Sequence, residues 1–229
     1  LFVVAAATAN VREGLDLAET MHWAVSVIDV QETAQRNLQS AMARREGRLD
    51  SADAFLMIAR DRQAVLTISV NDELYFSRRL DLPEGFMDMA WDSVNAVVAP
   101  AVDAYTPVAE YVPDYSVGGA PHGVDYSGAA TASAALDDGD KVQRVLDEVR
   151  RSIELWGRAW SNMPLAGLSV SAGDRSQELA TWLRREMGLT VSTMDLADQF
   201  AGFEGGDAAD RAYCVPLLGV LLRTETRKL

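Results

Sequence analysis

The sequence contains one pattern of elements twice, and this duplication constrains the fold more than any other feature. Each copy reads as an apolar strand, an amphipathic helix, a second strand and a second helix. The expected elements are residues 2–8, 10–20, 24–30 and 32–45 in the first copy, and 165–172, 175–187, 190–194 and 208–223 in the second. Strands joined by a helix are parallel neighbours in one sheet. The pattern therefore predicts an α/β protein built from two related halves.

Only the second copy is preceded by further strands. β-Branched and aromatic residues are concentrated in 54–58, 64–70 and 74–80, and Asn71-Asp72 lies at a hairpin position between the last two. We expect these segments to form an antiparallel meander in the same sheet as the strands of the second copy.

The first copy has no such meander, and the sequence enters a strand pattern directly at Leu1. We therefore expect that N-terminal sequence is missing. The expected division is 1–50, the C-terminal part of a first half, and 51–229, a complete second half.

Residues 83–139 interrupt the second half. Apolar spacing in 83–99 is compatible with a helix. The stretch 100–139 contains Pro100, Pro107, Pro113, Pro121 and the pair Gly118-Gly119, which predicts a long irregular insertion. A helix is then expected over 140–160, where apolar residues recur at three and four positions.

The composition excludes several classes of function. The net charge of −13 argues against a nucleic-acid surface, which requires clustered Lys and Arg. One cysteine and two histidines exclude an internal disulfide and a metal site of the Cys or His type. No apolar run reaches the length of a membrane span, and no signal peptide is visible.

Asp29 lies at the end of the expected strand at 24–30. Functional groups often lie at such strand ends in α/β proteins. A capping role for the helix that begins near Glu32 is an equally good interpretation.

Several short motifs resemble those of the PilM-like pilus assembly proteins. They are the meander ending in Phe76-Ser77-Arg78, the segment Ile28-Asp29-Val30 before a helix starting Glu32-Thr33-Ala34, the helix at 146–155, and the apolar-Leu-Gly-apolar-Leu-Arg ending at 216–223. Together they cover most of the chain apart from the insertion. The chain also resembles the MSHA pilus biogenesis protein MshI and, more distantly, the cytoplasmic domain of the secretion protein GspL.

The resemblance implies an actin-like (RNase H-like) α/β fold with a partial first half and a complete second half. It implies a cytoplasmic scaffold, peripheral at the inner membrane, that contacts the N-terminal cytoplasmic tail of a single-pass inner-membrane pilus assembly protein. The assembly ATPase is a further expected partner. Nucleic acid and direct membrane insertion are not expected.

In actin-like proteins the phosphates of ATP lie between two hairpins that carry an acidic residue and glycines. Here Met57 occupies the expected Asp position and Ala59 the expected Gly position. Asp61 is either a displaced carboxylate or part of a charged surface turn. Gly173 is either the remaining glycine of the turn that approaches adenosine, or part of a strand-to-helix turn with Asp174 as cap. These departures predict no cofactor, with ATP and Mg²⁺ as the alternative.

Two functional hypotheses follow. The first is a non-catalytic scaffold of a type IV pilus, MSHA-like, or of a related secretion machine. The second is an ATPase or small-molecule kinase of the actin-like superfamily, whose first phosphate hairpin lies in the missing N-terminal sequence. An accidental similarity of a generic α/β domain is a third interpretation.

Overall fold

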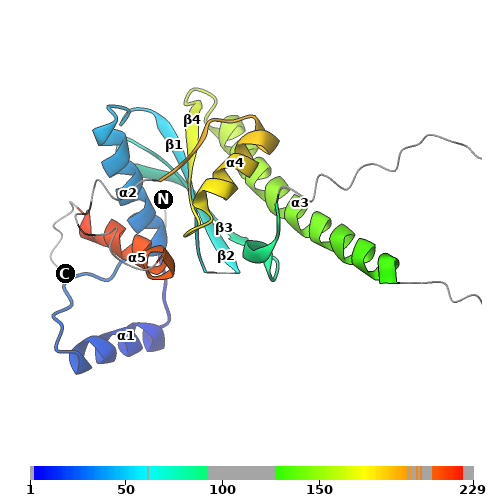
Figure 1. Ribbon diagram of the computed structural model, residues 1–229. Helices are drawn as coiled ribbons and strands as arrows, with labels where there is room; N and C mark the ends of the chain where they lie inside the picture. The colour runs from blue at the N-terminus through cyan, green and yellow to red at the C-terminus, as the bar shows by residue number, and fades with distance from the viewer. Residues whose placement is uncertain are drawn as a thin grey trace, which may run out of the picture.

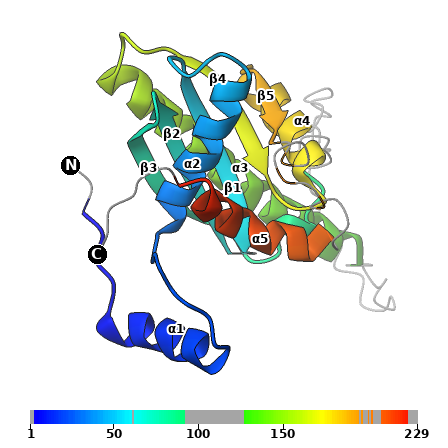
Figure 2. The same cartoon turned by 90° about the vertical axis from the view of Figure 1, so that its left-hand side faces the viewer.

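The computed structural model describes residues 3–60, 62–91, 127–194 and 208–223, together with residues 196, 200 and 202. Within this part of the chain, a five-stranded sheet lies between two layers of helices (Figure 1). Helices α2 and α5 cover one face of the sheet, and helices α3 and α4 cover the other. Helix α1 stands away from the sheet in both views (Figures 1 and 2).

The elements follow the predicted order in most of the chain. The helices are α1 Thr8–Thr20, α2 Gln31–Arg45, α3 Ser127–Ala159, α4 Ser176–Met187, α5 Ala208–Leu221 and the 3-10 turn η1 Phe86–Asp88. The strands are β1 Ala52–Arg60, β2 Gln63–Val70, β3 Glu73–Asp81, β4 Leu165–Ser171 and β5 Val191–Thr193.

The strand order is β3-β2-β1-β4-β5. Strands β1, β2 and β3 form an antiparallel meander, while β4 pairs parallel with both β1 and β5. Asn71 and Asp72 turn the chain between β2 and β3 with φ values of 49° and 67°, as the tightest hairpin turns require. The predicted meander, its hairpin turn and its place in the sheet of the second copy are confirmed.

Side chains alternate between two cores along the central strand β1. Leu56 and Ile58 point into the larger core under α3 and α4, which also contains Trp91, Trp156 and Trp182. Phe55 and Met57 point to the opposite face, where they pack with residues of α2 and α5. Burial on both faces explains why β1 reads as a continuous apolar run.

The contact between α2 and the sheet includes polar side chains beside the apolar cluster around Leu38. Nε2 of Gln35 donates to the carbonyl of Val65 (3.1 Å), and Nε2 of Gln39 donates to the carbonyl of Asp53 (2.7 Å). The Thr67 hydroxyl, on β2 between them, donates to Oε1 of Gln39 (2.8 Å). These side chains are buried, and their hydrogen bonds to the strands fix the position of α2 over β1 and β2, while Oε1 of Gln35 has no hydrogen-bond partner among the described residues.

Helices α2 and α5 approach each other at Gly219. A Cβ atom built at Gly219 would lie 2.1 Å from the carbonyl oxygen of Ala34, which is backbone and cannot rotate away. Nδ2 of Asn37 also donates to the carbonyl of Gly219 (2.9 Å). The close approach of the two helices therefore requires glycine at this position.

The predicted strands at 2–8 and 24–30 are wrong for the described residues. Residues 3–7 and 23–30 have no regular secondary structure, and most of their side chains are exposed. A strand is stabilised by hydrogen bonds to a neighbouring strand, and no described strand pairs with these segments. The two predicted helices of the first copy do form, as α1 and α2.

The region after the meander departs from prediction in part. The described residues of the expected helix 83–99 contain only the turn η1, and 92–99 lie outside the described residues. Residues 100–126 of the expected insertion also lie outside them. Residues 127–139 are not irregular but form the first turns of α3, in keeping with the several alanines in this stretch, the strongest helix former.

We predict that Gly219→Ala lowers the free energy of unfolding by about 1–3 kcal/mol, because the added methyl group forces α5 away from Ala34. The matched control is Gly157→Ala in α3, where a Cβ meets nothing within 4 Å. The control should be neutral or stabilising by up to about 1 kcal/mol, since alanine favours helix. Urea denaturation of both variants measures the difference, and equal stability of the two would contradict the packing argument.

Candidate functional site

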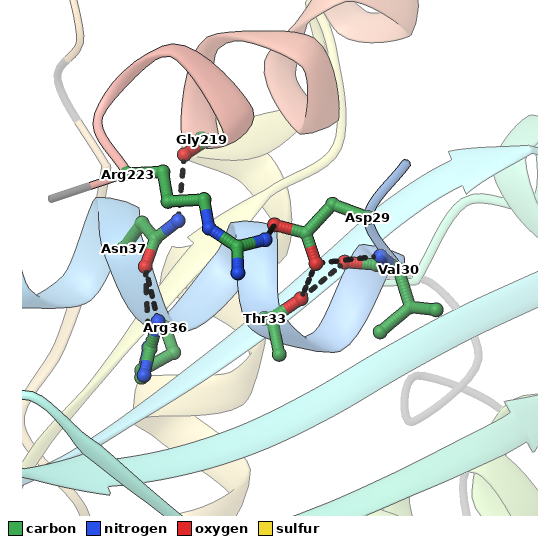
Figure 3. A network of polar contacts seen from close by, with 7 residues as sticks. All are labelled: Asp29, Val30, Thr33, Arg36, Asn37, Gly219 and Arg223. Atoms are coloured by element: carbon green, nitrogen blue, oxygen red, sulfur yellow. Dashed lines mark hydrogen bonds and ion pairs between the residues drawn. The ribbon is translucent and has the colours of Figure 1, made fainter. Parts of the chain in front are cut away.

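The start of α2 is joined to the end of α5 by a network of polar contacts centred on Asp29 (Figure 3). One carboxylate oxygen of Asp29 accepts a hydrogen bond from the Val30 amide (2.8 Å) and contacts the Thr33 hydroxyl. The other oxygen pairs with Nη1 of Arg223 (3.3 Å), beyond the C-terminus of α5. Asp29 thus secures the first turn of α2 from the residue before its N-cap Val30, where negative charge is favourable.

The predicted cap Asp29 is wrong in the strict sense, because the N-cap of α2 is Val30 and no side-chain cap hydrogen bond is made. Asp29 instead bonds to the amide of that N-cap and to the Thr33 hydroxyl. The side chain of Asp29 is 8% exposed and its charge is compensated by Arg223. A carboxylate that is buried, hydrogen-bonded and paired is poorly placed to exchange protons with a substrate. The network therefore positions the chain rather than performing chemistry.

A second contact lies one turn further along α2. Asn37 donates to the carbonyl of Gly219, and its Oδ1 accepts from the guanidinium of Arg36 at 2.8 and 3.2 Å. Together with the Asp29–Arg223 pair, it holds α2 and α5 as one unit (Figure 3). The segment before Asp29 joins the body of the protein at this unit.

That segment is unusually apolar for an exposed part of a protein. We call residues 3–28 the N-terminal apolar segment. Its exposed large apolar residues are Val3, Val4, Leu15, Leu17, Met21, Trp23, Val25, Val27 and Ile28. Val3 is 82% exposed and Trp23 is 65% exposed. Clustered exposed apolar side chains are typical of interaction surfaces.

The structure brings two of the four predicted nucleotide-site positions close together. Met57 pairs in register with Ser171 at the end of β4, two residues before Gly173. Ala59 lies near the end of β1. Asp61 lies outside the described residues.

Met57 does not face an open site. It is 1% exposed and packs with Leu38, Phe55 and Val215 under α2 and α5. An unpaired carboxylate in this apolar cluster would be strongly destabilising. The methionine is therefore part of the core between the sheet and the two helices.

Gly173 forms the turn between β4 and α4 with φ +61°, which favours glycine. The predicted cap Asp174 is wrong, because the N-cap of α4 is Arg175 and it makes no side-chain cap hydrogen bond. Instead the Ser176 hydroxyl donates to the carbonyl of Gly173 (2.7 Å) and accepts from the amide of Ala172 (2.8 Å). The turn is held by a residue inside the helix that follows.

Arg175 was not singled out by the sequence. Its guanidinium lies 3.9 Å from the centre of the Trp91 ring and donates to the carbonyls of Met87 and Met89. Its hydrogen bond to Glu178 lowers the pKa of that carboxyl. Arg175 ties the turn at Gly173 to the chain after the meander. Its contacts are distant in sequence, so no local signal reveals them.

Two motifs that carry the family resemblance meet in the structure. Arg78, from the end of the meander, pairs with Glu148 and donates to the Ser152 hydroxyl (3.2 Å), both on α3. The next residue, Arg79, lies on the other face and donates to Glu32 of α2 (2.8 Å). Burial alone raises the pKa of Glu32, but the hydrogen bonds from Arg79 and from its own backbone, with the charge of Arg79, leave that pKa below its usual range.

In the part of the chain that the structure describes, no group of His, Cys, Asp and Glu side chains is arranged to hold a metal ion. None of the described helices combines the length and apolar character needed to span a bilayer.

No protein-family model matches the sequence, and neither does any curated protein sequence. Among solved structures, the chain is similar to a chain of a structure described as the PilM-PilN type IV pilus biogenesis complex, with a TM-score of 0.53 and 19% sequence identity. The similarity covers 92% of this chain and 57% of that chain. It confirms a PilM-like mixed α/β fold. The closer relationship to MshI and GspL stays a prediction.

We predict that Asp29 and Arg223 are energetically coupled, because removing one partner leaves a largely buried charge. In a double-mutant cycle of Asp29→Asn and Arg223→Gln, the coupling in unfolding free energy should be about 1 kcal/mol. The control cycle is Arg62 with Glu84, a pair whose side chains are exposed and which should show no measurable coupling. Urea denaturation measures both couplings. Equal coupling in the two cycles would contradict the conclusion that the Asp29–Arg223 pair stabilises the contact between α2 and the end of α5.

Proposed function

We propose that this chain is a non-catalytic scaffold in the assembly of a type IV, MSHA-like pilus or of a related secretion machine. The observation that carries the proposal is the exposed N-terminal apolar segment, which is joined at Asp29 to an otherwise closely packed body. The fold likeness to a chain of the PilM-PilN complex supports the choice of machine.

The proposed partner is the N-terminal cytoplasmic tail of a single-pass inner-membrane pilus assembly protein, with the assembly ATPase as a further partner. Residues 3–7 and 23–30 have no regular secondary structure, and their backbone can pair with an extended peptide. The net charge of −13 favours a tail that carries Lys or Arg. A basic tail is also attracted to the anionic headgroups of the inner leaflet. The scaffold would thus be cytoplasmic and peripheral at the inner membrane through its partner.

The non-catalytic part of the proposal rests on the positions at which an actin-like protein would bind a nucleotide. Met57 is embedded in a core cluster, and Arg175 together with the Ser176 hydroxyl holds the turn at Gly173. The carboxylate that would manage Mg²⁺ is replaced by an apolar side chain. In this proposal the chain acts by binding other proteins through its surface.

We predict that basic juxtamembrane peptides of pilus inner-membrane proteins bind the chain with weak to moderate affinity that falls with salt. Trp23→Ser with Val25→Ser removes apolar surface without changing the charge and should weaken binding about tenfold, because both side chains are exposed in the N-terminal apolar segment. The control is Leu155→Ser, at 44% exposure close to the 46% of Val25 but on α3, across the sheet.

Fluorescence anisotropy with labelled peptides at low and high salt makes the measurement. Binding unaffected by salt would remove the electrostatic argument. If no platform peptide binds, or if Leu155→Ser weakens binding as much as the Trp23 and Val25 variant, the docking role of the N-terminal apolar segment is refuted.

The alternative function is an actin-like ATPase or small-molecule kinase. Its support in the structure is the left-handed turn at Gly173 beside the end of β1. We predict no saturable binding of Mg-ATP up to about 5 mM, because metal coordination and backbone donors are lost together at Met57 and Ala59. Isothermal titration tests this directly, and saturable binding would favour the alternative.

A further inference from the structure

The outer face of α3 carries charges in a regular order. Its exposed residues Asp140, Arg144, Asp147, Arg151, Glu154 and Arg158 alternate in sign at steps of three and four residues. At about 100° per residue they fall in one narrow stripe, directly opposite the buried Val149. We call these six residues the α3 charge stripe. Figure 1 shows α3 on the outside of the molecule, with its N-terminal turns running past the sheet.

Ion pairs within α3 do not involve all six side chains of the α3 charge stripe. Arg158 lies 3.8 Å from Glu154, and Asp147 pairs with Arg150 outside the stripe at 3.2 Å. Arg144 and Arg151 contact no carboxylate within 4 Å among the described residues, although Asp140 and Asp147 stand four positions before them. Within the described residues, the guanidinium groups of Arg144 and Arg151 are thus available to a partner.

Positions equidistant from 149 carry opposite charges, and this makes the stripe complementary to itself. Consider a second α3 that lies antiparallel, with position 149 of the two helices at the same height along the axis. The facing positions are then Asp140 with Arg158, Arg144 with Glu154, and Asp147 with Arg151. Every acidic residue then meets a basic one, and a two-fold axis repeats each pair. A parallel arrangement in register brings like charges together instead.

We propose that α3 pairs antiparallel with α3 of a second copy of this chain through the α3 charge stripe. A uniformly basic or uniformly acidic partner meets repulsion at every second position, whereas a second copy matches all of them. The second half of the stripe also borders a hollow of about 450 Å³, lined in part by Asp147, Arg151 and Arg158, into which partner side chains can enter.

The expected dimer is weak. The stripe is about 27 Å long at 1.5 Å per residue, which is short for a stable interface. Exposed ion pairs each contribute little. We therefore expect a dissociation constant near 100 µM at low salt (order of magnitude) that rises by about tenfold between about 50 mM and about 500 mM salt.

Sedimentation velocity over a range of protein concentrations tests the pairing by reversing charges. Arg151→Glu places two acidic groups opposite each other and should weaken the dimer about tenfold or more. Adding Asp147→Arg to Arg151→Glu exchanges the signs and should restore it. The control Arg62→Glu makes the same change of net charge in the exposed hairpin between β1 and β2, and should have no effect.

Cross-linking tests the register. In a Cys214→Ser background, mixed Asp140→Cys and Arg158→Cys chains should form the mixed disulfide in large excess over either symmetric one. A chain that stays monomeric at about 500 µM and low salt overturns the proposal, since this concentration exceeds the expected dissociation constant. So does a dimer insensitive to Arg151→Glu, one not restored by the double exchange, or equal formation of all three disulfides.

Discussion

The close approach of α2 and α5 at Gly219 is the contact on which the arrangement of the chain depends. Helix α2 precedes the whole sheet in sequence, and α5 follows it. Because Gly219 has no side chain, the backbone of α5 reaches Ala34, and Asn37 can bond directly to the Gly219 carbonyl. This contact places Arg223 beside Asp29 and so fixes where the N-terminal apolar segment leaves the body of the protein.

The two faces of the sheet are held by different forces. Under α3 and α4 the core is apolar and contains Trp91, Trp156 and Trp182, so burial of surface dominates there. Under α2 the contacts include buried amides that bond to strand carbonyls. Hydrogen bonds are directional, whereas apolar burial is not. The polar layer therefore fixes the register of α2 on the sheet more narrowly than apolar packing alone could.

Consecutive arginines of β3 link the two faces. Arg78 reaches α3 through Glu148 and Ser152, and Arg79 reaches α2 through Glu32. The period of a strand sends neighbouring side chains to opposite sides, so one edge strand holds a helix on each face. Among the described residues, Arg78 and Arg79 thus hold helices against the sheet, whereas the two proposed interaction surfaces, the N-terminal apolar segment and the α3 charge stripe, are exposed.

The sequence by itself determined the elements that depend on local pattern. The meander, the Asn71-Asp72 turn and the helices α2 and α4 follow from alternation, turn chemistry and helical spacing, which act over a few residues. The tertiary structure decided which of these patterns found partners. The apolar runs at 2–8 and 24–30 read as strands, yet a strand forms only beside another strand. Met57 was identified as a departure from a nucleotide site, but its burial among α2 and α5 depends on contacts far apart in the chain. The roles of Arg175 and Arg223 were hidden for the same reason, since their partners lie 88 and 194 positions away.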